Sequence, residues 1–396
     1  MPNRIVLFAL AMAALSCVSA TPAPIPTPTP APPARAEEPA EPWAFAVSGD
    51  SRDCGDLIMP KIAAAVLAET GPANSFYWHL GDFRRMYDID CDILKRTHPT
   101  FDCKTRSWDS LGSDEMAEYS RTAYDDFIQY QLEPFGAFPV LLGIGNHELY
   151  GRSRDEFRRV FRPWLAQKML HTQRLADAAR KLPVDVGGTW YHFVMRGVEF
   201  INLDNGDESM FSHRQLVWLG RVLAEAVKDP AIRSIVVGMH EALPYSTSRG
   251  HAMDSSCQGL CSGQQVYDML FRAQGLSGPV EKRKKVYVLA SHDHTFKTDV
   301  YNTPEHNGQV LPGWIVGTAG AVQSGDPIAY GYLRMEVALD GTVTPRFRPV
   351  SRTSPPLGSG SGAESLEQFC FEANKRIQAE EAFKGDCVCG ATRPAE

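Results

Sequence analysis

The fold of this chain is decided by WAFAVSGD at residues 43–50 and SFYWHLGD at residues 75–82, two apolar runs that each end in Gly-Asp. Between them the sequence predicts a helix over residues 60–70, because Pro60 is tolerated in a first turn and Gly71 follows the last residue. A strand, a helix and a strand at this spacing form a parallel unit with a right-handed crossover. Both Gly-Asp pairs are therefore expected at the same edge of one sheet.

Three further motifs place metal-binding side chains at or near the end of an apolar run. They are Gly145-Asn146-His147-Glu148, Val237-Gly238-Met239-His240 and His292-Asp293-His294, which follow predicted strands at residues 139–144, 232–237 and 286–290. Strand ends at one edge of a sheet can bring together ligands that lie far apart in the chain. Asp, Asn and His together suit divalent metals, and a pair of such ions is a common device for attacking phosphate esters.

The remaining segments predict an α/β protein with two sheets between helical layers, since parallel strands alternate with helices and hairpins are added. Two capping boxes begin helices, one at Ser153 with Glu156 and one at Ser212 with Gln215. Further elements are expected as helices at 114–132, 213–227 and 264–274, hairpins at 190–203 and 330–347, and insertions at 83–113 and 245–263 that shape the leaving-group pocket.

The order and the residue types of the five motifs resemble those of the calcineurin-like metallophosphoesterase superfamily, including the purple acid phosphatases. The resemblance covers residues 43–350 and implies a four-layer α/β/β/α sandwich. Within that pattern Asp82 would bridge two divalent ions (Mn, Fe, Zn or Mg). His147 would protonate the leaving group as general acid, with Glu148 orienting it or keeping it charged. The other metal ligands that the resemblance implies are Asp50 and His294 on the first ion, and Asn146, His240 and His292 on the second.

Each motif alone also has a purely structural explanation. Gly-Asp and Gly-Asn are common turn dipeptides, and Asp50 and Asp82 could cap a turn or a helix after a strand. His240 on its own is more often a hydrogen-bonded histidine than a ligand. The metal site is favoured because every ligand type occurs in the family order.

Two positions depart from the family pattern, and both concern the first metal. Arg52 stands where most members have a histidine ligand, and Arg85 stands where purple acid phosphatases have a tyrosine, the nearest tyrosine being Tyr87. The first ion would keep three protein ligands, and would be weakly held, more water-ligated or a harder ion such as Mn²⁺ or Mg²⁺. Ser291 replaces the usual glycine before His-x-His, and His251 is a candidate for the pocket wall.

The arginines could instead bind substrate. Arg52, two residues after a metal ligand, is predicted to grip phosphate bidentately, and Arg84 and Arg85 are weaker candidates. The alternative for all three is a structural ion pair, with Asp53 or Asp88 as nearby partners.

The N-terminus predicts export. Residues 1–20 combine Arg4, an apolar run and small residues up to Ala20, as in a signal peptide. Leu15-Ser16-Cys17 also resembles a bacterial lipobox, in which Cys17 would be acylated, and plain secretion after Ala20 is the alternative. Residues 21–42, rich in Pro and Ala, predict an extended linker. The protein is therefore expected to be periplasmic, secreted or lipid-anchored to a bacterial membrane.

Eight of the nine cysteines remain when Cys17 is set aside, and an even count in an exported chain indicates disulfides rather than a zinc–thiolate cluster. The C-terminal extension, residues 351–396, holds three of them. If all eight pair, one or three bonds must join this extension to the main domain, because three is odd. The simplest prediction is one bridge to the segment 54–103, one local bond in each segment, and Cys257–Cys261.

The formal net charge is −7, and it becomes −8 without residues 1–20, which hold one Arg and no acidic residue. This argues against nucleic acid as a constitutive partner. The predicted function is hydrolysis of small-molecule phosphate mono- or diesters outside the cytoplasm, by a hydroxide held on a dinuclear metal site. The alternative is a surface-anchored binding protein with an incomplete metal site. The motifs leave monoesters and diesters equally open.

Overall fold

The structure is a computed structural model that describes residues 41–69, 71, 73–103, 113–182, 188–207, 209–275, 283–323, 329–352, 365–373, 387 and 389. The predicted signal peptide and lipobox lie outside these residues, as do residues 21–40 of the predicted linker. None of the helices within the described ranges is long and apolar enough to cross a membrane.

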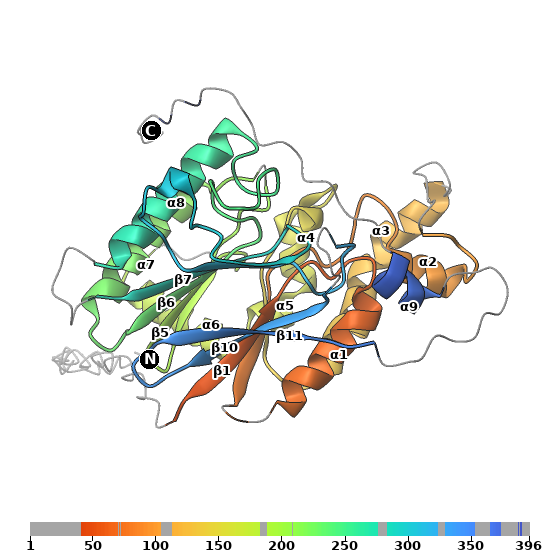
Figure 1. Ribbon diagram of the computed structural model, residues 1–396, viewed down its shortest axis with the longest axis horizontal. Helices are drawn as coiled ribbons and strands as arrows, with labels where there is room; N and C mark the ends of the chain where they lie inside the picture. The colour runs from red at the N-terminus through yellow and green to blue at the C-terminus, as the bar shows by residue number, and fades with distance from the viewer. Residues whose placement is uncertain are drawn as a thin grey trace, which may run out of the picture. The chain divides into compact units, whose positions relative to one another are not determined.

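Two mixed sheets form the centre of the fold (Figure 1). The first has the strand order β11-β10-β1-β2-β3, and the second has the order β4-β5-β6-β7-β9-β8. In the first sheet the strands are β1 (Trp43–Ser48), β2 (Asn74–His79), β3 (Val140–Leu142), β10 (Gly331–Val337) and β11 (Val343–Pro349). In the second they are β4 (Tyr191–Met195), β5 (Val198–Asn202), β6 (Ser234–Gly238), β7 (Lys285–Ala290), β8 (Phe296–Thr298) and β9 (Gly313–Val316).

The pairing of β1 with β2 and of β2 with β3 is parallel, and so is the pairing along β5, β6, β7 and β9. This confirms the strand–helix–strand prediction, since consecutive parallel strands end at the same edge. The helices are α1 (Gly55–Ala68), α2 (Cys91–Thr97), α3 (Ser113–Phe127), α4 (Arg154–Val160), α5 (Arg162–Leu165), α6 (Lys168–Ala179), α7 (His213–Lys228), α8 (Cys257–Ala273) and α9 (Leu366–Gln368).

Three apolar cores show the layering. In β1, Phe45 and Val47 face a core shared by both sheets, whereas Ala46 faces a second core that includes residues of α1 and α3. In β6, Val236 faces the shared core, while Ile235 packs in a third core with residues of α7 and α8. Alternate strand residues thus point to opposite faces, and helices cover the outer face of each sheet. The four-layer α/β/β/α prediction is confirmed.

Two helices begin earlier than predicted, each for a local reason. Helix α1 starts at Gly55 rather than at Pro60, because the carbonyl of Cys54 already accepts from Ile58 N at 2.9 Å. Pro60 therefore lies inside the helix. Helix α8 starts at Cys257 rather than at residue 264, because Ser256 caps it by accepting from Gly259 N. The glycines in its first two turns hide it from a propensity argument.

Two predicted helix caps are confirmed, and one helix was not predicted. Ser153 and Ser212 cap α4 and α7 as predicted, accepting from the backbone nitrogens of Glu156 and Gln215. The insertion predicted at 83–113 contains a helix that was not predicted, α2, and five of its seven residues are buried.

Four disulfides link the described cysteines: Cys54–Cys370, Cys91–Cys103, Cys257–Cys387 and Cys261–Cys389. The bridge from the C-terminal extension to the first cysteine segment is confirmed. The predicted Cys257–Cys261 pair is wrong, as is a local bond within the extension. Both cysteines lie in the first turns of α8 and each bonds a cysteine of the extension, so that three bonds anchor the tail rather than one.

Candidate metal centre

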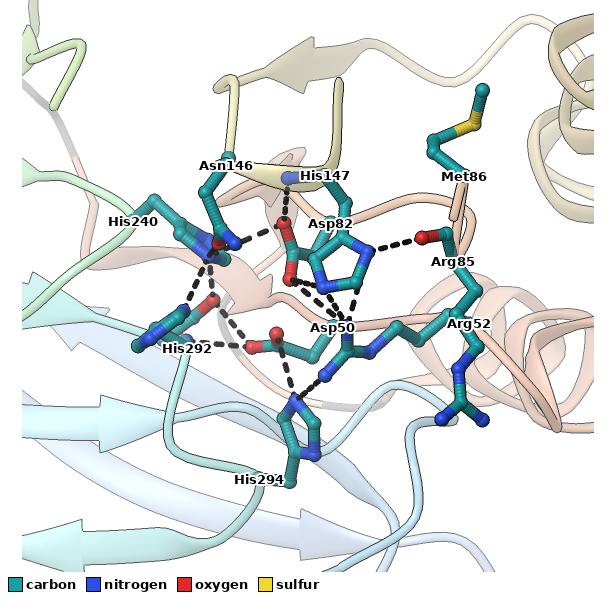
Figure 2. Close-up of polar contacts among 12 residues, drawn as sticks. Asp50, Arg52, Asp82, Arg85, Met86, Asn146, His147, His240, His292 and His294 are labelled. Atoms are coloured by element: carbon teal, nitrogen blue, oxygen red, sulfur yellow. Dashed lines mark hydrogen bonds and ion pairs between the residues drawn. The ribbon is translucent and has the colours of Figure 1, made fainter. Parts of the chain in front are cut away.

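All six predicted metal ligands meet at one edge of the two sheets (Figure 2). Each follows the end of a strand, because the parallel strands of both sheets deliver their carboxyl ends there. Asp50 follows β1, Asp82 follows β2 and Asn146 follows β3. The histidines come from the second sheet, His240 after β6 and both His292 and His294 after β7.

Asp82, His240 and His292 form the first of two overlapping groups that could hold a metal, with ligand atoms within 4.8 Å of one another. Nε2 of His240 lies 3.0 Å from Nδ1 of His292 and 3.3 Å from Oδ1 of Asp82. It also lies 3.1 Å from Oδ1 of Asn146. Nδ1 of His240 can donate to the carbonyl of Leu80 at 3.1 Å, which turns the lone pair of Nε2 inward. Four electron-rich atoms thus converge where a cation fits.

Asp50, Asp82 and His294 form the second group, and Asp82 belongs to both. Oδ2 of Asp50 accepts from Ser291 Oγ at 2.6 Å and from His292 N at 2.7 Å. Oδ1 of Asp50 and Oδ2 of Asp82 are buried and accept no hydrogen bond from the described residues. Such atoms are costly to bury unless a cation compensates them, so the second group calls for a positive charge, from a metal ion or from a side chain.

The electrostatics of the centre favour charged carboxylates. Burial opposes the ionisation of Asp82, but His147, His240 and Arg52 hold its pKa well below the usual range. Burial likewise opposes the charge on His240, yet Asp82 and Asp50 raise the pKa of His240 to about 10. A metal ion and a proton therefore compete for Nε2 of His240.

Three of the candidate ligands have strained backbones. Asp50, Asp82 and His292 adopt φ angles of 59°, 58° and 65°, in the left-handed region that non-glycine residues rarely occupy. Strain of this kind persists where the surrounding structure fixes it, and it gathers at functional sites. Gly145 shows how tightly the centre is packed, because a Cβ there would lie 2.3 Å from Oδ1 of Asp82.

Glu148 supports the centre in a way that differs from the sequence-based expectation. Its carboxylate does not orient His147 but accepts from three backbone nitrogens, those of Asp82 at 2.8 Å, Phe83 at 2.7 Å and Gly145 at 2.8 Å. This clamps together the turns after β2 and β3. Neither this clamp nor the Ser291 hydroxyl on Asp50 could be found from sequence, because both depend on the path of turns distant in the chain.

His147 lies beside Asp82, and its own backbone nitrogen donates to Oδ1 of Asp82 at 3.1 Å. Its Nδ1 bonds the carbonyl oxygen of Arg85, and its Nε2 contacts Nη1 of Arg52. Burial and the charge of Arg52 lower the pKa of His147 to about 3. The imidazole is thus neutral at physiological pH in this arrangement.

The three arginines have different surroundings. Arg52 points into the centre, with Nη2 at 2.7 Å from Nε2 of His294. Arg84 is buried in ion pairs with Asp56 and Asp92, none of which is a candidate ligand. Arg85 pairs with Asp53 and Asp88, the two residues expected as partners if the arginines form structural ion pairs.

Two aromatic side chains flank the ligands. The ring of Tyr87 lies 4.7 Å from that of His147, so it lines the general-acid position rather than the metal positions. The ring of His251 lies 5.6 Å from that of His292, which places His251 against the first group.

No family model and no curated protein matches this chain. Among solved structures, a purple acid phosphatase, PPD1, isolated from yellow lupin (Lupinus luteus) seeds, is 13% identical with a TM-score of 0.48. That match covers 79% of this chain and 52% of the phosphatase, so this chain spans about half its length. GAP50, the anchor in the inner membrane complex of Plasmodium, is 11% identical with a TM-score of 0.43, over 88% of this chain and 91% of that one. Neither likeness assigns a family or an activity to this chain.

Proposed function

We propose that the protein hydrolyses phosphate esters with the help of bound divalent metal. The observation that carries this proposal is the pair of overlapping donor groups that share Asp82. A binding protein has no need of two adjoining cation positions joined by one carboxylate, whereas phosphoryl transfer does, because negative charge develops on several oxygens at once.

In this proposal Asp82, Asn146, His240 and His292 hold a divalent ion, and Asp50 and His294 face the adjoining position. A bound ion would supply a Lewis acid and generate a nucleophile from water at neutral pH. The side chains behind the ligands, Ser291 and Glu148, keep the carboxylate of Asp50 and the backbone of Asp82 in place. Orientation of this kind matters because a small displacement of a ligand costs activity.

His147 is the proposed general acid. Its Nδ1 is engaged by the carbonyl of Arg85, so Nε2 is the atom that faces the centre and would pass a proton to the leaving oxygen. Burial and the positive charge of Arg52 depress the resting pKa of the ring, and a bound phosphate dianion offsets the contribution of Arg52. Substrate binding thus favours the protonation that the step needs.

A second candidate function is ligand binding at the surface of a membrane without turnover. The position of Arg52 favours this binding function, since the guanidinium contacts His294 and Asp82 of the second donor group, where one of the two ions would lie.

Metal content measured alongside turnover separates the two functions. Purified protein should contain bound Mn, Fe, Zn or Mg and should hydrolyse p-nitrophenyl phosphate, its bis-ester, or both. Asp82→Asn should lose both properties, while Asp155→Asn, a change to an exposed carboxylate on α4, should keep them. Metal binding without turnover of either ester in wild-type protein would favour the binding function.

We also propose that the protein works outside the cytoplasm, in the periplasm, in the medium or on a lipid anchor at Cys17. The four disulfides support this, because such bonds persist in oxidising compartments. Intact-mass measurement of the protein purified from its own cells tests it. An N-terminus at Thr21 indicates secretion, a diacylated Cys17 indicates anchoring, and an unprocessed Met1 refutes export.

A further inference from the structure

The guanidinium of Arg52 lies within the second donor group, among Asp50, Asp82 and His294. We propose that it takes the place of the first metal ion, so that the centre binds a single divalent ion, at Asp82, Asn146, His240 and His292. This inference rests on the proposed metal-dependent function and specifies the composition of its site. It also revises the expectation of two ions.

The guanidinium of Arg52 contacts two of the ligand atoms that a metal ion in the second group would use. Its Nη2 lies 2.7 Å from Nε2 of His294, and its Nη1 lies 3.7 Å from Oδ2 of Asp82. Figure 2 shows the guanidinium between the two residues, on the side of Asp82 that faces away from His240 and His292. The Arg52 residue is only 8% exposed, so its charge is compensated by the centre rather than by water.

The imidazole of His294 cannot serve both cations at once. Its Nδ1 lies 2.8 Å from the carbonyl oxygen of Val322 and donates to it. That leaves a single lone pair, on Nε2, which accepts from Arg52. A metal ion at this position would have to displace the guanidinium from the same lone pair.

Charge counting also favours one metal ion. Asp50 and Asp82 contribute −2 and Arg52 contributes +1, since an arginine stays protonated in proteins. One divalent ion brings the sum to −2 + 1 + 2 = +1, and two bring it to −2 + 1 + 4 = +3. The nearby carboxylate of Glu148 faces backbone nitrogens, and that of Glu241 accepts from Ser209, so neither faces the ions. A buried excess of three charges is strongly unfavourable.

The backbone holds Arg52 in this direction. The nitrogen of Ser51 donates to the carbonyl of Asp82 at 2.9 Å, and that of Asp53 donates to Oδ1 of Asp90 at 2.7 Å. Two residues after Arg52, Cys54 is bonded to Cys370. Both flanks are therefore fixed, so the backbone of Arg52 cannot shift away from the centre.

The same contacts bear on phosphate binding by Arg52. Bidentate recognition of a phosphate uses two guanidinium nitrogens that face the ligand. Here Nη1 contacts Nε2 of His147 and Nη2 contacts Nε2 of His294, so the fork is turned toward the imidazoles. The geometry favours a fixed positive charge in the centre over a freely presented phosphate clamp.

The number of bound ions tests the inference. The full exported chain is stripped with chelator, reloaded with Mn²⁺, and measured by titration calorimetry and elemental analysis. Wild type should bind one ion per chain. Arg52→Ala and Arg52→His should bind two, with magnetic coupling between the Mn²⁺ ions in electron paramagnetic resonance. Arg85→His is the matched control and should bind one, because that guanidinium pairs with Asp53 and Asp88.

Ligand variants locate the single ion. His240→Ala should weaken Mn²⁺ binding by more than about 100-fold, whereas His294→Ala should leave the affinity within about twofold of wild type. The opposite pattern overturns the inference. So do two ions in wild type, although the proposed function then stands, and one ion in both Arg52 variants, since the guanidinium would not be what excludes the second. Absence of bound Mn²⁺, Fe²⁺, Zn²⁺ and Mg²⁺ from wild type and Arg52→His alike refutes the proposed function itself.

Discussion

Removal of the charge on His192 should change how the stability of the fold depends on pH. His192, on β4, is buried, with Nδ1 at 2.7 Å from Oε1 of Glu199 and Nε2 at 2.9 Å from Oδ2 of Asp177. Burial alone lowers its pKa, but the two carboxylates raise the pKa of His192 to about 9. Against a value near 6.5 in the unfolded chain, the difference corresponds to about 3 kcal/mol.

The sign follows from which state binds more protons. The folded protein retains the proton of His192 up to about pH 9, whereas the unfolded chain loses it near pH 6.5. The contribution is therefore complete below pH 6.5 and is lost as the pH rises to 9 and beyond. The free energy of unfolding should fall by about 3 kcal/mol over this window because of His192 alone.

Urea unfolding of the disulfide-intact protein between pH 6 and pH 10 measures this. Other groups titrate in the same range, so the comparison is with His192→Gln, in which this part of the slope should disappear. His213→Gln, at the exposed start of α7, should keep the wild-type slope. If wild type and His192→Gln show parallel stability curves from pH 6.5 to pH 9, the linkage argument is wrong.

Three further predictions concern the metal centre and the tail. Asp82→Asn should remove bound metal and lower turnover by several orders of magnitude, because one carboxylate serves both donor groups. Elemental analysis that finds metal still bound, together with near-normal turnover, would contradict this prediction. His147→Ala should keep its metal but slow esters with poor leaving groups by about 10²–10⁴-fold, and activated aryl esters much less; equal slowing in both assays would instead indicate a positioning role. Cys54→Ser with Cys370→Ser should lower the free energy of unfolding by about 6 kcal/mol in the chain-entropy model, given a sequence separation of 316; an unchanged denaturant midpoint would show that this bond constrains little.

The positions of the ligands could be predicted from sequence because they depend on a local rule. Asp50, Asp82 and His292 follow apolar strands directly, and parallel strands end at one edge whatever the loops do. The bridging role of Asp82 was implied by the family resemblance, and the structure places Asp82 in both donor groups. The sequence was also sufficient for the caps at Ser153 and Ser212, which involve residues only three positions apart.

What could not be predicted depends on the path of the chain between elements. The direction of Arg52 depends on its neighbours, because the backbone nitrogen of Ser51 donates to Asp82 and that of Asp53 donates to Asp90. No spacing in the sequence encodes these hydrogen bonds. Cysteine parity restricted the number of tail bonds to one or three, but the choice required the start of α8. Because Cys257 and Cys261 lie one helical turn apart, both face the tail, and a bond between them would forfeit that docking.

The Cys54–Cys370 bond makes a covalent ring of almost the whole domain. A single cut of the backbone between residues 104 and 256 gives two pieces, and this is the only one of the four disulfides that joins them. For a cut between Asn146 and β6, one piece holds Asp50, Asp82 and Asn146, and the other holds the three histidines. A nicked molecule would therefore migrate as an intact chain without reductant and would keep both halves of its ligand set attached.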